Sequence, residues 1–378
     1  MGQIVSCREI EPKEFMNGQR TGRWRFFGVR AGLLAALGVV VLLQSGGCYY
    51  VQAVNGQLEL LRKREPIEEV VKDADLDDEI RRRLAMVLEV RQFAVDELRL
   101  PDNDSYKTYV DLGRDYVVWN VFAAPEFSLE PRTWCFPVVG CVAYRGYFAE
   151  SAARRHAEKL DAEGFDVYVG GVPAYSTLGR FDDPVLNTML RWSDADLVAT
   201  VFHELAHQRL FVKGDTGFNE SFATAVGEAG LARWLEAQGR EGELDAYERR
   251  GELRETMTRI VDEARAQLAA LYAEPNDPEV TRERKAALME QLVERAEQAA
   301  AEAGFAGSGW LRPPLNNARL LPFALYRGHV DAFRALLTEC SDDFECFYAA
   351  AESLADLEPE ARSRRLEALA SSTGRDAR

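Results

Sequence analysis

The sequence predicts an α+β fold that is mostly helical, with a small mixed sheet ahead of a helix that carries HELAH at residues 203–207. Apolar residues recur at helical spacing up to residue 100 and again from Ser193 onward. Residues 106–180 have a different texture, because they are rich in aromatic and β-branched side chains between Pro and Gly turns. Hydrophobic residues make up 47% of the 378-residue chain, which is enough for a sizeable core, so we expect a folded body.

The first 47 residues are typical of an export signal. Arginines between residues 20 and 30 precede an apolar run over 31–43, and small residues lead into Cys48. The run is shorter than the roughly 20 residues that span a membrane. It resembles a bacterial lipoprotein signal, which implies a lipid on Cys48, anchoring to a membrane and a location facing the periplasm of a Gram-negative bacterium. An uncleaved anchor and free secretion are the alternatives, and translation starts at Met1 or Met16.

The charge and length of the remaining chain indicate one acidic body. The formal net charge of the full chain, −16, argues against nucleic acid as a partner, because phosphate binding needs clustered Lys and Arg. After removal of residues 1–47, we expect residues 48–378 to form a single body. It would comprise a helical part (48–105), a part with the sheet and the HELAH helix (106–240) and a second helical part (241–378).

Turn residues divide the first half of this body. A helical region over 49–100 is broken at Pro66 and closed by Pro101. Short strands follow over 106–180, with one intervening helix at 151–163. Residues 170–175 suit an edge strand, because Pro173 cannot donate a ladder hydrogen bond.

The second half is predicted to be helical almost throughout. Residues 241–303 are rich in Ala, Glu, Arg and Leu and are interrupted near Pro275, which indicates a long helical hairpin. Another helical segment follows Pro314 and contains Tyr326 and His329, and the end is expected to fray from about residue 371.

If the chain is exported, its cysteines are expected to form disulfides. Cys135 and Cys141 are six positions apart, and so are Cys340 and Cys346, which suggests two short-loop disulfides in an oxidising compartment. A second metal site is the competing interpretation. It is disfavoured because neither pair has a nearby His or the Cys-x-x-Cys spacing.

The HELAH segment has the context that a metal-binding helix requires. Ser193 and Asp196 form an N-cap signature, and the helix that follows is expected to reach about Val212. His203 and His207 are four residues apart, so both imidazoles project from one face and can hold one ion. Glu204 is placed to hold the metal-bound water and take its proton. Zn²⁺ suits this set because it lowers the pKa of water and polarises a carbonyl.

A second helix is predicted to supply the third ligand. It begins near NESFA at 219–223, after a turn at Gly214 and Asp215, and is expected to end near Gly239. A returning helix would bring Glu220 beside the histidines. The residues three, four and seven positions later would let the two helices approach closely, since all are small or modest in size: Ala223, Thr224 and Gly227. Glu228 is the alternative ligand or a partner for a histidine. The HExxHxxGxxH class is excluded by Leu210 and Lys213.

HELAH followed by NESFA resembles the gluzincins, zinc peptidases in which an NE-x-x-A helix supplies a glutamate ligand. The chain is also similar to a family of bacterial lipoproteins described as predicted aminopeptidases. The shared stretches run from Cys48 to about Leu320: GQLELLRKREPI, FPVVGCVAYRGYF, GGVPAYSTLGRFDDPVLNTML, HELAHQRLFVKGDTGFNESFA and NNARL. The resemblance implies a membrane-anchored zinc aminopeptidase that binds peptide as a strand added along an edge, here at Gly171, Ala174 and Tyr175.

Three questions stay open from the sequence. Oxyanion stabilisation needs a donor near the metal, and among the candidates we favour Tyr326 over Tyr144, Tyr147, Tyr175 and His329. The acidic residue that grips a free α-amine is not identified, so an endopeptidase is an alternative. A membrane-tethered binding or scaffold protein with a structural zinc site is the rival from another class, and Glu204 argues against it, because a structural site has no use for a water-activating base.

Overall fold

The computed structural model describes residues 47–136, 140–177, 181–305, 311, 313–324 and 329–373. Two compact units make up the chain, Met1–Val54 and Asn55–Arg378. The predicted signal before residue 47 and the oxyanion candidate Tyr326 lie outside the described residues. Among the helices that are described, none is both long and apolar enough to cross a membrane.

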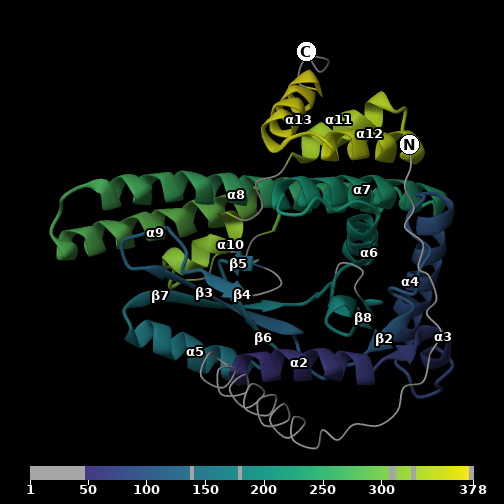
Figure 1. Ribbon diagram of the computed structural model, residues 1–378, viewed down its shortest axis with the longest axis horizontal. Helices are drawn as coiled ribbons and strands as arrows, with labels where there is room; N and C mark the ends of the chain where they lie inside the picture. The colour runs from purple at the N-terminus through teal and green to yellow at the C-terminus, as the bar shows by residue number, and fades with distance from the viewer. Residues whose placement is uncertain are drawn as a thin grey trace, which may run out of the picture. The chain divides into compact units, whose positions relative to one another are not determined.

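The structure is α+β and mostly helical, as predicted (Figure 1). The N-terminal helical region divides near Pro66 as expected, into α2 (Gly47–Arg62), α3 (Ile67–Val70) and α4 (Asp78–Asp96). The helix expected within the strand region is α5 (Glu150–Ala162), and a 3₁₀ turn, η1 (Met189–Arg191), precedes the HELAH helix. The expected hairpin is formed by α8 (Gly242–Ala273) and α9 (Pro278–Glu302), which pack side by side around an apolar seam of their own (Figure 1).

The strands form two small sheets and one hairpin. The first sheet has the order β1-β2-β8 and is mixed, since β1 (Glu65–Pro66) is antiparallel and β8 (Val185–Leu186) parallel to β2 (Thr108–Val110). The second is antiparallel, in the order β6-β3-β7, and consists of β6 (Arg145–Tyr147), β3 (Val118–Pro125) and β7 (Phe165–Val172). Helix α5 packs on β3 and β7 (Figure 1). Phe122 and Ala124 of β3 pack instead against η2 (Asn317–Leu320) and α10 (Leu321–Ala324).

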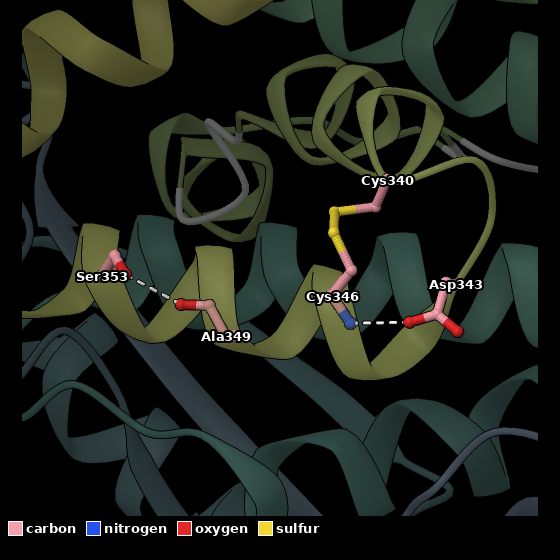
Figure 2. The surroundings of a disulfide bond; sticks show 5 residues. All are labelled: Cys340, Asp343, Cys346, Ala349 and Ser353. Atoms are coloured by element: carbon pink, nitrogen blue, oxygen red, sulfur yellow. Dashed lines mark hydrogen bonds between the residues drawn. A yellow bond between two sulfur atoms is a disulfide. The ribbon is translucent and has the colours of Figure 1, made fainter.

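Both predicted cysteine pairs are disulfides. Cys135 and Cys141 face each other across the hairpin of β4 (Trp134–Phe136) and β5 (Gly140–Val142). Cys340 ends α11 (Val330–Glu339) and is bonded to Cys346 in the first turn of α12 (Phe344–Ala355), as Figure 2 shows. Asp343 caps α12 by accepting a hydrogen bond from the Cys346 N–H at 2.7 Å, so cap and disulfide fix the same turn. The last helix is α13 (Pro359–Thr373).

The HELAH helix and its successor differ from the sequence prediction at their ends. Ser193 caps α6 (Asp194–Arg209) as expected, by accepting a hydrogen bond from the Asp196 N–H. Helix α6 stops at Arg209 instead of reaching Val212, because the Asn219 side chain binds both backbone groups of Val212, at 2.7 and 2.8 Å. Helix α7 (Thr216–Ala237) starts before Asn219, since Asp215 caps it through the Phe218 N–H, and it ends before Gly239.

The small residues predicted on α7 do bring the two helices into close contact. A Cβ atom at Gly227 would lie 2.8 Å from the backbone oxygen of Ala199 and 3.4 Å from the Cβ of His203. One turn later, a Cβ at Gly230 would lie 2.7 Å from the ring of Phe202. The approach of α7 to α6 therefore depends on glycine at these positions.

Gly227→Ala is expected to lower the free energy of unfolding by about 1–3 kcal/mol, because an added methyl group in a tightly packed contact forces the helices apart. Urea unfolding measures this change. The matched control is Gly251→Ala in α8, where the nearest atom to an added Cβ is the Arg254 side chain at 3.9 Å. There alanine should stabilise by about 0.5–1 kcal/mol through its helix propensity. Equal effects of the two substitutions would contradict the packing argument.

Candidate metal centre

Two histidines and a glutamate meet where α6 and α7 pack together. His203 and His207 lie on one face of α6, and Glu220 lies in the first turns of α7, as the sequence predicts. Their possible ligand atoms all lie within 4.8 Å of one another, so the three side chains form a group that could hold a metal ion.

The spacing of these atoms can be compared with that of a tetrahedral site. The two histidine Nε2 atoms are 3.1 Å apart. Glu220 places Oε2 at 3.4 Å from His203 Nε2 and Oε1 at 3.6 Å from His207 Nε2. Nitrogen and oxygen ligands of Zn²⁺, which bind at 2.0–2.2 Å, stand about 3.4 Å apart in tetrahedral geometry. The three side chains therefore fit one such ion, with a fourth position left over.

The surroundings of His207 and Glu220 shift their pKa values in the directions that metal binding requires. Burial lowers the pKa of His207 to about 4, and the neighbouring His203 acts in the same direction. His207 is therefore neutral at physiological pH, which a metal-ligating imidazole must be. Burial works to raise the pKa of Glu220, but the hydrogen bond with His203 and the electrostatic interactions with both histidines bring it below its ordinary value. This direction favours the ionised form of Glu220, which a metal-binding carboxylate requires.

Glu204 has a different environment from Glu220. Burial raises its pKa, although the charge of His203 and a hydrogen bond with the Ser176 side chain oppose this effect. The charge of Glu204 in turn helps burial to raise the pKa of Tyr106, a buried residue with φ of 62°. Sequence patterns did not indicate Ser176 or Tyr106, because both come from loops that reach Glu204 only in the folded chain.

The tyrosine and histidine candidates for an oxyanion donor are distributed unevenly. Burial raises the pKa of Tyr144, and the carboxylate of Glu220 adds to this rise, so Tyr144 lies within electrostatic range of the metal-binding group. Tyr147 instead packs against the His156 ring at 5.8 Å, on the side of the sheet occupied by α5. Tyr175 makes an edge contact with Phe148. His329 precedes α11, and its backbone N–H donates to the Ser221 hydroxyl at 2.6 Å, next to Glu220.

Strand β7 is an edge strand, as the sequence predicts, although it ends at Val172 and does not reach residue 175. The Val172 carbonyl accepts from Val117 on the β3 side, whereas the Val167 carbonyl accepts from the Asn316 side chain on the other side. Backbone groups alternate along a strand, so those of Val169 and Gly171 point outward. No hydrogen-bond partner for them occurs in the part of the chain that is described.

The three residues proposed to contact substrate have distinct surroundings. A Cβ at Gly171 would lie 2.4 Å from the Tyr116 ring, so packing alone accounts for a glycine at this position. Ala174 packs against the main core, and Tyr175 is 36% exposed. Beyond Val172 the chain continues to Ser176, which contacts Glu204, so the open edge leads toward the candidate metal centre.

Glu228 does not join the metal-binding group. Two bonds from the Arg334 guanidinium, at 2.8 and 3.1 Å, hold its Oε2. Arg334 lies on α11, more than a hundred residues later in the chain, so the sequence around Glu228 gave no sign of this partner. The alternative of Glu228 as a ligand is thus not supported by the contacts of this side chain.

Comparison with known proteins identifies a family. The family model described as "Putative aminopeptidase" matches residues 48–366, and the chain belongs to this family. No curated protein and no solved structure matches the chain, so the gluzincin fold expected from the motif stays a prediction.

We expect the metal-free protein to bind one Zn²⁺ per chain in a calorimetric titration. His207→Ala and Glu220→Ala should each weaken binding by at least about tenfold, because each removes one of three ligands. Glu228→Ala is the control, since Glu228 is held by Arg334, and it should bind Zn²⁺ like the wild type. Binding that survives Glu220→Ala but is lost in Glu228→Ala would show that the ligand set is wrong.

Proposed function

We propose that this member of the Putative aminopeptidase family is a zinc-dependent peptidase, with His203, His207 and Glu220 as ligands of one Zn²⁺ and Glu204 as general base. The observation that carries the proposal is that the two histidine Nε2 atoms and the Glu220 carboxylate oxygens lie 3.1–3.6 Å apart. The carboxylate of Glu204 follows His203 directly on the same helix. Two histidines and a glutamate with an open fourth position are the ligand set of a catalytic zinc, whereas structural zinc sites use four protein ligands.

The roles of the side chains follow from their environments. Bound Zn²⁺ supplies Lewis acidity toward the scissile carbonyl and lowers the pKa of water. Glu204 accepts a proton from the attacking water as the new C–O bond forms. It then gives this proton to the amine nitrogen as the C–N bond breaks, so the carboxylate is regenerated. Because burial raises the pKa of Glu204, it is a stronger base than an exposed glutamate.

The open edge of β7 supports a binding mode for the substrate. A peptide added as a strand can exchange hydrogen bonds with the outward backbone groups of Val169 and Gly171. It would then extend along Ala174 and Tyr175 toward Glu204. Tyr144, in range of Glu220, is a candidate for stabilising the oxyanion, and Tyr326 is the other.

Glu204→Gln should retain Zn²⁺ and lose about 10²–10⁴-fold in kcat, because glutamine cannot accept the proton. Cleavage of a peptide library, followed by mass spectrometry, measures the loss and gives the position of the cleaved bond. N-acetylated copies of the cleaved peptides distinguish an aminopeptidase, which needs a free α-amine, from an endopeptidase. Tyr144→Phe and Tyr326→Phe in the same assay identify the oxyanion donor.

Two results would oppose the proposal. If wild type and Glu204→Gln both bind Zn²⁺ and neither cleaves any peptide, the chain is a binding protein with a structural zinc site. If both cleave at equal rates, hydrolysis does not use Glu204.

We also propose that the protein is exported and anchored through a lipid on Cys48. The apolar run over 31–43 and the small residues before Cys48 support this, as do the two disulfides, which form in oxidising compartments. Mass spectrometry of the protein from membranes should find a mature chain that begins at a lipid-modified Cys48, and Cys48→Ala should abolish the modification. An intact segment 1–47 or an unmodified Cys48 would overturn the proposal.

A further inference from the structure

We propose that Ser176 and Asp183 position the carboxylate of Glu204, with Asp183 holding the loop and the Ser176 hydroxyl contacting the base. Both are positioning residues, since Asp183 acts through Ser176 and Ser176 acts through Glu204. The inference rests on the proposed function, because it concerns the base of that reaction.

Asp183 is a buried anchor for this loop. It is 1% exposed, and both of its carboxylate oxygens accept hydrogen bonds. Oδ2 accepts from the Thr177 N–H at 2.9 Å and from the Ser176 hydroxyl at 3.0 Å. Oδ1 accepts from the Thr177 hydroxyl at 2.8 Å. A buried carboxylate with three donors from two adjacent residues fixes the backbone on which Ser176 lies.

The same network ties the loop to the HELAH helix. The Tyr106 N–H donates to the Asp183 carbonyl at 2.6 Å, and the Asp183 N–H donates to the Ser105 hydroxyl oxygen at 3.3 Å. Gln208 of α6, one turn after Glu204, donates to the same Ser105 oxygen at 3.3 Å. The loop that carries Ser176 and the helix that carries Glu204 are therefore held by one set of buried polar contacts.

The Ser176 hydroxyl can donate its single proton to either of two carboxyl groups. The hydroxyl has one proton and lies between two carboxyl groups, those of Asp183 and Glu204. Asp183 keeps the Thr177 N–H as a donor when Ser176 donates to Glu204. One rotation of the hydroxyl therefore lets Ser176 donate to either carboxyl group.

The test compares four variants, each loaded with Zn²⁺: Ser176→Ala, Ser176→Thr, Ser105→Ala and Glu204→Gln. Ser176→Ala should lower kcat about tenfold, because one hydrogen bond to a charged group is lost, and leave KM and Zn²⁺ content unchanged. Ser176→Thr keeps a hydroxyl and should restore most of kcat. Ser105→Ala is the matched control, since Ser105 is buried in the same network and bonds Asp183 and Gln208. It should lower Tm and reduce kcat less than Ser176→Ala does, because the Ser176 hydroxyl is still present.

Binding of a phosphinic peptide provides a second readout that does not depend on turnover. This mimic of the tetrahedral state presents an oxygen to Glu204, so Ser176→Ala should weaken its binding about tenfold in calorimetry, and Ser105→Ala should weaken it less. Circular dichroism and Tm establish that each variant is folded.

Several results would overturn the inference. The first is a Ser176→Ala variant with the kcat and the phosphinic peptide affinity of the wild type. The second is a Ser105→Ala variant that loses as much kcat and affinity as Ser176→Ala, which would indicate general loosening of the network. A failure of Ser176→Thr to restore kcat would also oppose it.

The outcomes separate the two proposals. If wild type cleaves, Glu204→Gln does not and Ser176→Ala equals wild type, only the positioning role is wrong. If wild type and Glu204→Gln are equally active, the proposed function itself fails.

Discussion

The candidate metal centre depends on the close contact between α6 and α7. The three candidate ligands come from two helices, so their spacing depends on how near the helix axes lie. Gly227 brings α7 against the Ala199 carbonyl, and Gly230 receives the Phe202 ring. A larger side chain at Gly227 would meet the Ala199 backbone, so we expect it to push α7 away from α6 close to the candidate ligands.

The segment NESFA shows how much structure one short motif carries. Asn219 closes the loop between the helices by binding both backbone groups of Val212, and Glu220 joins the histidines. Ser221 donates to the Gly217 carbonyl and accepts from the His329 N–H, which ties the start of α11 to α7. Phe222 stacks on Phe347 of α12, and Ala223 is fully buried. The candidate ligand Glu220 is thus flanked on both sides by residues that fix its helix, which is the support that a metal site requires.

The sequence predicted those features that local patterns determine. Helical spacing and caps located α6 and the α8–α9 hairpin, and cysteine spacing identified both disulfides. It could not predict contacts between distant segments, for which no periodicity exists. Helix α6 ends early because the Asn219 side chain binds Val212. Glu228 stays apart from the candidate metal centre because it is bound by Arg334. The approach of Ser176 to Glu204 likewise follows from loop packing around Asp183, a residue that no sequence pattern singles out.

Two glutamates lie at the candidate centre, and their surroundings move their pKa values in opposite directions. Both are affected by burial, which favours the protonated form. At Glu220 the hydrogen bond with His203 and the electrostatic interactions with both histidines outweigh burial, and the pKa falls. At Glu204 burial outweighs the charge of His203 and the contact with Ser176, and the pKa rises. A carboxylate that stays ionised suits a ligand, whereas one with a raised pKa suits proton transfer. The assignment of Glu220 as ligand and Glu204 as base therefore rests on environment as well as on position in the sequence.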